Sequence, residues 1–284
     1  MKKTLKHLGA FFTLALLVFA ITSCSNPAGG GGDNVLQIGN TSVSFNNTGG
    51  NWGHITLRGS VNSTGSPTIT GDSVSITSTA NISGGISEGG FYLTGSANLT
   101  IAGGTLSLGT GGTNGGINHN STGLLTISGG VVASSRTNGT IRLQHADSKM
   151  IMSGGTVRHN LNGATAIAIN VVSDDENAVI ISGGTIGSMT GEHGGTITEL
   201  PGMAIRSTGT GGITIRGNAL ITSSSVSNGT IRLQHATGGT LRIEGDTVRN
   251  QNSSGNSVGL AISVNGGDNS RVIITGGTVT PTFP

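Results

Sequence analysis

Arginine and glutamine side chains recur in one short motif of this chain. The ten residues TNGTIRLQHA at 137–146 return as SNGTIRLQHA at 227–236, so nine of ten residues repeat at a displacement of 90. Strand alternation turns the isoleucine and leucine of each copy inward and leaves the threonine, arginine and glutamine facing solvent. These outward residues are Thr140, Arg142 and Gln144 in the first copy and Thr230, Arg232 and Gln234 in the second. Guanidinium and amide groups on one face could hold an anionic surface, such as a sulfated or uronic polysaccharide.

Acidic side chains are dense at only one place, the run Asp174, Asp175 and Glu176. Oxygen ligands of this kind suit a hard cation such as Ca²⁺. The matching stretch later in the chain, VNGGDNSRV, keeps only Asp268, which favours a polar turn over a calcium site. His145 and His235 follow the TIRLQ motif without an acid or second histidine at ligand spacing, so we expect turn residues and no bound metal or cofactor.

Catalytic patterns are weak throughout the chain. Glycoside hydrolysis needs two carboxylates that face each other across the scissile bond, and acids at matching positions of successive repeats are nearly absent. No serine lies in a nucleophile elbow. We therefore expect a non-catalytic protein, with a polysaccharide lyase or hydrolase as the alternative.

One insertion offers a second kind of contact. The stretch GSMTGEHGGTITELP at 187–201 falls in the longest interval of the repeat described below and is predicted to be a loop. Solenoid proteins often bind partners through such insertions. Glu192 and His193 are the candidate contacts at its tip, and a loop without a ligand is the alternative.

The N-terminus has the layout of an export signal. Three lysines precede the apolar run FFTLALLVFAIT, which is too short to span a bilayer, and ITSC follows at 21–24. The ending ITSC resembles a bacterial lipobox, which implies cleavage before Cys24, acylation of its thiol and, with Ser25 next, sorting to the outer membrane. We predict a signal peptide at 1–23, a lipidated cysteine with a glycine-rich tether at 24–34, and one domain at 35–284.

The charge balance argues against nucleic acid as a partner. The formal net charge is +2, but three of the fourteen basic residues are Lys2, Lys3 and Lys6 of the signal. Eleven basic residues then stand against twelve acidic ones, which gives a mature charge of about −1. A mature protein with this balance is not a generic basic binder of nucleic acid.

A short pattern ending in a glycine corner recurs seven times and predicts the fold. The copies are LTIAGGTL, LTISGGVV, MIMSGGTV, VIISGGTI, ITIRGNAL, LRIEGDTV and VIITGGTV, and they stand 26, 25, 29, 34, 28 and 31 residues apart. Each copy alternates like a half-buried strand, and the glycine supplies the positive φ that a sharp turn needs. Units of this length cannot bury their apolar face alone, so they must stack as a solenoid.

These ISGGTV-type units resemble the right-handed parallel β-helix repeats of the pectin-lyase-like superfamily. The resemblance covers about residues 35–279 and implies an all-β, single-stranded solenoid of roughly 9–10 coils. An antiparallel β-sandwich is the alternative. Stacking would bring Arg206, in the strand MAIRS, onto the face of Arg142 and Arg232, with the two motif copies about three strand spacings, roughly 14 Å, apart.

The repeated motif belongs to a longer duplication, which leaves its role open. AIAINVVSDDENAVIISGGTI from Ala166 aligns without gaps to GLAISVNGGDNSRVIITGGTV from Gly259. A block copied whole keeps its surface residues whether or not they bind, so a solvated face is the alternative to a ligand face. At the C-terminus, Phe283 could cover the last coil. We expect a surface lipoprotein whose solenoid is an adhesive or structural module touching extracellular polymers or host and matrix components, with a carbohydrate-binding module as a further alternative.

Overall fold

The computed structural model describes short strands between Val35 and Gly84 and then residues 91–96, 98–108, 115–191, 194–235, 238–252, 259–267 and 269–281. Residues Asn34–Pro284 form one compact unit. The described residues are strands and turns, so the all-β class is confirmed. No helix in this part of the chain is long and apolar enough to cross a membrane.

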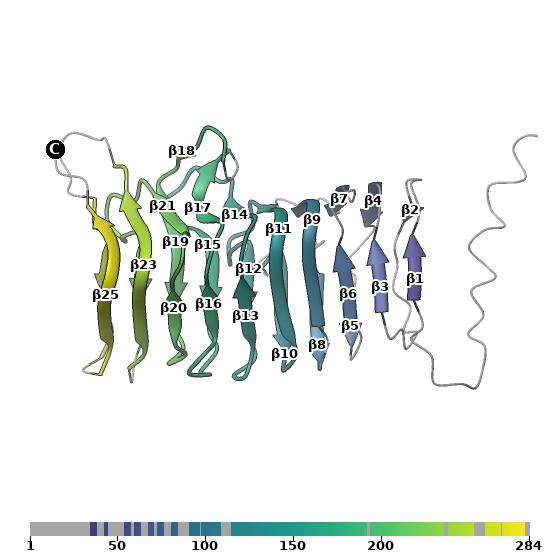
Figure 1. Ribbon diagram of the computed structural model, residues 1–284, viewed down its shortest axis with the longest axis horizontal. Helices are drawn as coiled ribbons and strands as arrows, with labels where there is room; N and C mark the ends of the chain where they lie inside the picture. The colour runs from purple at the N-terminus through teal and green to yellow at the C-terminus, as the bar shows by residue number, and fades with distance from the viewer. Residues whose placement is uncertain are drawn as a thin grey trace, which may run out of the picture. The chain divides into compact units, whose positions relative to one another are not determined.

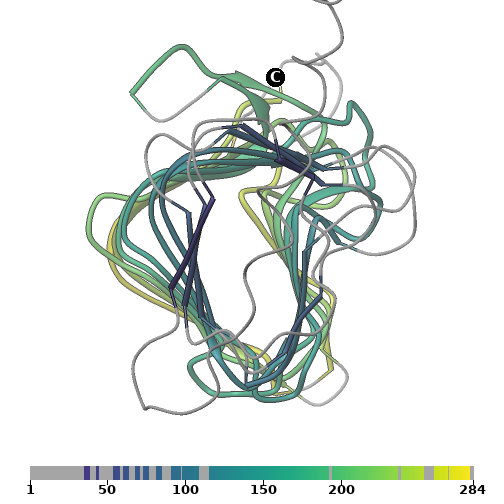
Figure 2. The ribbon, with the colours of Figure 1, turned by 90° about the vertical axis from the view of Figure 1, so that its right-hand side faces the viewer.

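The strands stack into three faces, which we call A, B and C (Figures 1 and 2). Face A holds β1 (Val35–Ile38), β3 (His54–Leu57), β6 (Ser73–Ile76), β13 (Lys149–Met152), β16 (Val179–Ile181) and β20 (Ile213–Ile215). Face B holds β2 (Val43–Ser44), β4 (Ser60–Ser63), β7 (Asn81–Gly84), β14 (Thr156–His159), β17 (Thr185–Thr190) and β21 (Leu220–Ser223). Four long strands run from face A into face B: β9 (Asn98–Leu108), β11 (Leu124–Ser134), β23 (Thr240–Asn250) and β25 (Arg271–Thr280).

Face C is a separate eight-stranded sheet. Its strands are β5 (Thr68–Thr70), β8 (Phe91–Gly95), β10 (Ile117–Ser121), β12 (Ile141–Leu143), β15 (Ala166–Val171), β19 (Gly202–Ser207), β22 (Ile231–Leu233) and β24 (Ile262–Val264). Neighbouring strands of all three faces pair in parallel, and the one antiparallel pair of the described strands joins β17 to the short β18 (Thr198–Glu199). The chain is therefore a parallel β-solenoid, and the β-sandwich alternative is wrong.

Each repeat copy forms the part of a coil that passes from face A to face B. Its inward positions stack into continuous apolar columns, because each strand pairs in register with the next coil. One such column contains Leu99, Leu125, Met150, Val179, Ile213 and Leu241, all essentially inaccessible to solvent. The core is thus a set of columns parallel to the solenoid axis, as the seven-copy pattern predicts.

The glycine of each copy makes the corner between faces A and B. Gly155, for example, has a φ of 79°, and a Cβ there would lie 2.7 Å from the carbonyl carbon of Gly129 in the previous coil. A side chain would therefore meet both a strained backbone and a backbone neighbour that cannot move aside. The corner allows one strand to bend onto the next face without losing its pairing.

The predicted insertion folds over face B as a small hairpin of β17 and β18 (Figure 1). The carboxylate of Glu199 accepts hydrogen bonds from Arg249 at 2.6 Å and from the hydroxyl of Thr222 at 2.9 Å. Arg158 donates to the carbonyl of Gly191 at 2.6 Å. The hairpin thus neutralises Arg249 through Glu199 and gives Arg158 an uncharged hydrogen-bond partner. Glu192 and His193, the proposed loop contacts, lie outside the described residues.

A pair of matched substitutions tests which side chains point inward. Ile181 is fully buried, whereas Thr214 is a half-buried outward residue of the adjacent strand. Ile181→Asp buries an unpaired charge and should lower the free energy of unfolding by at least about 3 kcal/mol. Thr214→Asp should cost less than about 1 kcal/mol, as measured by urea denaturation. Equal losses would contradict the assignment.

Candidate functional site

The three arginines of the repeated motif and its neighbour lie in one column on face C. The strand register pairs Arg142 with Asn170, Asn170 with Arg206, and Arg206 with Arg232. Arg142 and Arg232 are therefore three strand steps apart, as predicted, and Arg206 joins them. The whole column, which we call the arginine column, contains Tyr92, Asn118, Arg142, Asn170, Arg206, Arg232 and Ser263.

Side-chain amides hold two of these guanidinium groups in place. Arg206 donates from Nε to Oε1 of Gln234 at 2.9 Å, and Arg232 donates from Nη1 to Oδ1 of Asn228. Gln234 and its counterpart Gln144 lie one residue beyond their strands, and their backbone amides donate to Ser207 and His119 of the preceding coils. The predicted residues of the ligand face thus come together, with the glutamines beside the column.

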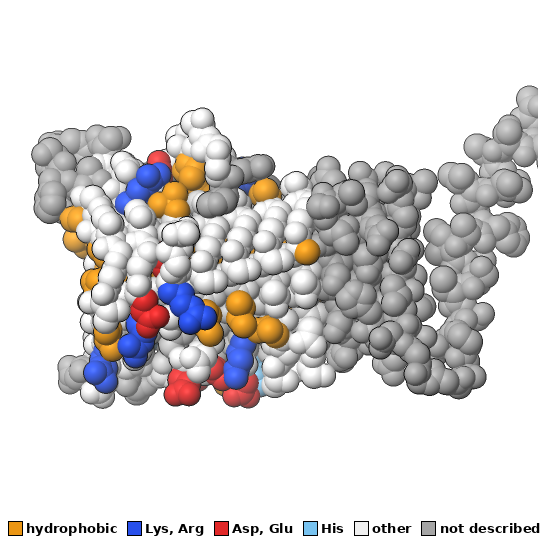
Figure 3. Space-filling model, in the orientation of Figure 1, with side chains coloured by type: hydrophobic (Ala, Val, Ile, Leu, Met, Phe, Trp, Pro, Cys, Tyr) orange, Lys and Arg blue, Asp and Glu red, His pale blue; other side chains and the backbone are white. Residues whose placement is uncertain are grey.

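Positive charge on the arginine column is not balanced by a carboxylate. The ion pairs among described residues are His145–Asp147, Lys149–Asp175, Arg242–Glu244 and Arg249–Glu199. Burial, and next the charge of Arg232, lowers the pKa of Arg206. Figure 3, which looks onto faces A and B, shows acidic and basic side chains interspersed. Face C differs because its arginines have neutral partners, which is the arrangement an anion would favour.

Unpaired polar atoms accompany the arginines. Asn118 and Asn170 are each only 5% exposed, and their Oδ1 atoms have no hydrogen-bond partner. The Nε atoms of Arg142 and Arg232 are also buried without a partner. Buried polar groups normally find partners in a folded protein. These four atoms are inaccessible to solvent, so they are unsatisfied groups beneath the column and not open positions on its surface.

Two residues of the motif were predicted to face solvent, and this prediction is wrong. Thr140 and Thr230 are fully buried, and their hydroxyls donate to the carbonyls of Arg158 and Arg249 at 2.8 Å. Strand alternation fails here because both threonines precede their strands, at the corner where the chain enters face C. Their role is to close that corner by binding backbone of face B.

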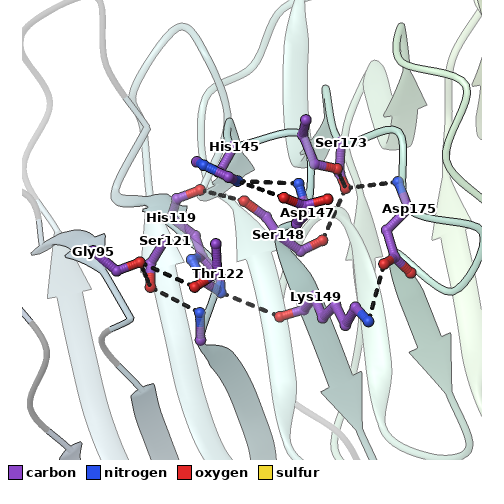
Figure 4. Close-up of polar contacts among 12 residues, drawn as sticks. Gly95, His119, Ser121, Thr122, His145, Asp147, Ser148, Lys149, Ser173 and Asp175 are labelled. Atoms are coloured by element: carbon purple, nitrogen blue, oxygen red, sulfur yellow. Dashed lines mark hydrogen bonds and ion pairs between the residues drawn. The ribbon is translucent and has the colours of Figure 1, made fainter.

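The acidic run lies in the turn that leads from face C to face A (Figure 4). Asp175 pairs with Lys149 at 2.9 Å and accepts the backbone amide of Asn177 at 2.8 Å. Asp174 accepts the amide and the hydroxyl of Thr210 in the next coil. No group of three potential metal ligands converges among the described residues, Glu176 included. Both aspartates act as turn-forming groups that fasten one coil to the next.

Hydroxyl and imidazole groups of the same turn also bind backbone (Figure 4). Ser148 donates to the carbonyl of His119 at 2.9 Å, and Ser173 donates to the carbonyls of Ala146 and Ser148. His145 lies 3.7 Å from Asp147, and its Nδ1 accepts the backbone amide of the same aspartate at 3.1 Å. Because Nδ1 accepts that hydrogen bond, neutral His145 carries its proton on Nε2. His145 is thus a turn residue, as predicted.

Three histidines are buried beneath the surface, which sequence reasoning did not predict. His119 and His159 lie inside the coils, where their Nε2 atoms contact the carbonyls of Lys149 at 3.2 Å and Arg136 at 2.8 Å. His235 contacts the carbonyl of Gly209 through Nδ1. Burial lowers the pKa of all three, and that of His119 falls to about 4. His159 and His235 lie at or just after a strand end, before a turn, which was the available signal in the sequence, whereas His119 lies within β10.

No protein-family model, no curated protein and no solved structure matches this chain. The geometry alone defines the class, which is a parallel β-solenoid with an arginine column on one lateral face.

The buried histidines predict loss of stability in acid. His119 is neutral in the fold, and its pKa rises from about 4 to the ordinary 6.5 on unfolding. Stability is therefore complete above pH 6.5 and falls as the pH drops towards 4, by roughly 3 kcal/mol for this group. His119→Gln can still donate to the carbonyl of Lys149 but does not titrate, so it should flatten this dependence. Urea denaturation at pH 7, 5.5 and 4 measures the free energy of unfolding of the parent and the variant. The same dependence of that free energy on pH in both proteins would contradict the assignment.

Proposed function

We propose that this chain is an exported, lipid-anchored surface protein whose β-solenoid is a non-catalytic adhesive module. It contacts extracellular polymers through face C. The observation that carries the proposal is the arginine column, in which Arg142, Arg206 and Arg232 stand in register and none is ion-paired with a carboxylate. A linear polyanion lying along the column would meet several guanidinium groups at intervals of one or two strand spacings.

An anionic polysaccharide is the partner we favour, with a host or matrix protein as the other outcome. The column has few rings, since Tyr92 is its one aromatic residue. Stacking on sugar faces would therefore contribute little, and charge and hydrogen bonds would dominate the contact. Nucleic acid is not the favoured partner, because a mature charge of about −1 is unlike that of a generic basic nucleic-acid binder.

The anchor follows from the N-terminal pattern. The lysine-rich start, the short apolar run and ITSC support lipidation of Cys24, and the tether at 24–34 would hold the solenoid off the outer membrane. The stacked ISGGTV-type coils support placing the domain with pectin-lyase-like right-handed β-helices. Members of that group include enzymes, but among the residues labelled in Figure 4 the hydroxyls of Ser148 and Ser173 bind backbone carbonyls and Asp175 is paired with Lys149.

Removing two arginines tests the ligand face. The mature chain Ser25–Pro284 should bind anionic members of a glycan array and not neutral ones. Each charge-assisted hydrogen bond contributes about 1.5–3 kcal/mol, so the double variant Arg142→Ala, Arg232→Ala should bind at least tenfold more weakly. Arg216→Ala removes an exposed arginine outside the column and should bind like the parent.

The result distinguishes the candidates. Equal binding by the parent and the double variant would remove face C from the proposal. Tight binding to one short neutral glycan would instead make the domain a carbohydrate-binding module. No glycan binding by either protein would overturn the polysaccharide proposal and leave protein partners for test.

The anchor has its own test. Cys24→Ser in the full chain removes the thiol that would be acylated, so the protein should stay as an unlipidated precursor. Labelling with an alkyne fatty acid should mark the parent and not the variant. Membrane fractions washed with high salt should retain a lipidated parent. A parent without label would exclude lipidation at Cys24.

A further inference from the structure

The last coil exposes apolar side chains at positions that the coil beneath it buries. Val272 and Ile274 of β25 stack on Leu241 and Ile243, and Val264 of β24 stacks on Leu233. The three residues beneath are buried, whereas Val272, Ile274 and Val264 are 37%, 51% and 46% exposed. These three side chains belong to the inward columns, so their exposure marks an open end of the core.

The backbone of the last coil is open as well. Strand β25 pairs along one edge with β23, and its other edge has no strand partner among the described residues. It is one of the longer strands, at 10 residues, and Arg271 is its single charged residue. A long edge strand with so little charge is a template for pairing with another strand.

We propose that this end binds the same end of a second copy, with β25 antiparallel to β25 about a twofold axis. The axis passes through the corner between faces A and B, beside Thr275 and Gly276. Face A of one copy then continues into face B of the other, and the two faces C meet at their β24 strands. This surface lies at the end of the solenoid and meets the arginine column only at Ser263 of β24, beyond the three arginines.

The sequence of β25 is complementary to itself in this register. Val272 falls opposite Val279 of the second copy, and both belong to inward columns. Ile274, the most exposed of the three apolar residues, falls opposite Gly277, which has no side chain and a φ of 87°. Arg271 falls opposite Thr280, which keeps the two Arg271 side chains at opposite ends of the interface. The branched side chain of Ile274 therefore lies opposite a glycine, and no two residues of like charge lie opposite each other.

Pairing of β25 with the other end of the solenoid fits less well. The first coil offers β1 of 4 residues and β2 of 2 residues, which are separate strands, whereas β25 runs unbroken around the corner. A head-to-tail contact of this kind would also leave a new open end on each added copy and would build filaments. The twofold arrangement closes after two copies.

Mass and cross-linking test the arrangement together. The mature chain Ser25–Pro284 contains the whole compact unit and has no cysteine, since Cys24 is the single one in the sequence. It should elute with twice the monomer mass in light scattering at tens of micromolar. Thr275→Cys places a thiol beside the axis and should form a disulfide-linked dimer on mild oxidation. Thr214→Cys, on the outer surface of an inner coil, should not.

A charge at the interface should separate the copies. Ile274→Lys puts two ammonium groups into the contact and should give a folded protein of monomer mass, with an unchanged far-ultraviolet spectrum. Leu161→Lys alters a side chain of similar exposure, 41%, away from this end and should stay dimeric. A monomeric parent would overturn the proposal and would favour Phe283 of the same chain as the residue that covers the apolar side chains of the last coil. Filaments, or a dimer that Thr275→Cys does not cross-link, would overturn it equally.

Discussion

Parallel backbone pairing in constant register is the constraint on which the rest of this structure depends. Each residue of a strand lies one strand spacing from its equivalent in the next coil, so a position in the repeat becomes a column in space. Apolar positions become a continuous core, glycine positions become a continuous corner, and arginine positions become a line of charge. The same constraint explains why an unpaired coil at the end is exposed along its full length.

The three faces differ in how their charges are used. Face A pairs Arg242 with Glu244 on one strand, and its edge pairs Lys149 with Asp175. On face B, Glu199 neutralises Arg249, and the uncharged carbonyl of Gly191 accepts a hydrogen bond from Arg158. On face C, Arg206 and Arg232 have side-chain amides as partners. Face C is therefore the surface on which three arginines stand in one column without a carboxylate partner, although the mature chain as a whole is close to neutral.

Sequence periodicity predicts the strands, the corner glycines and the arginine column, because a repeat that stacks in register turns sequence equivalence into contact. Arg206 could be placed beside Arg232 for this reason alone. The same reasoning fails where the chain leaves the repeat. Thr140 and Thr230 lie at a corner, where strand alternation no longer predicts whether a side chain points inward or outward. The contact between Glu199 and Arg249 could not be predicted either, because it joins an insertion to a residue 50 positions later in the chain. The buried histidines were missed because His119, His159 and His235 turn inward to carbonyls of neighbouring coils, and strand alternation does not show where those carbonyls lie.

The direction of the inter-coil hydrogen bonds has a mechanical consequence. These bonds point along the solenoid axis, so a pulling force along that axis loads successive coils in series and not in parallel. Coils would then peel off one after another from an end, each releasing the 25 to 34 residues of one repeat interval. The hairpin on face B is an exception, since Glu199 ties its own coil to Thr222 and Arg249 in the two that follow. Resistance to extension should therefore rise where the unravelling reaches that clamp, which makes the coils from β17 to β23 the strongest part of the solenoid under tension.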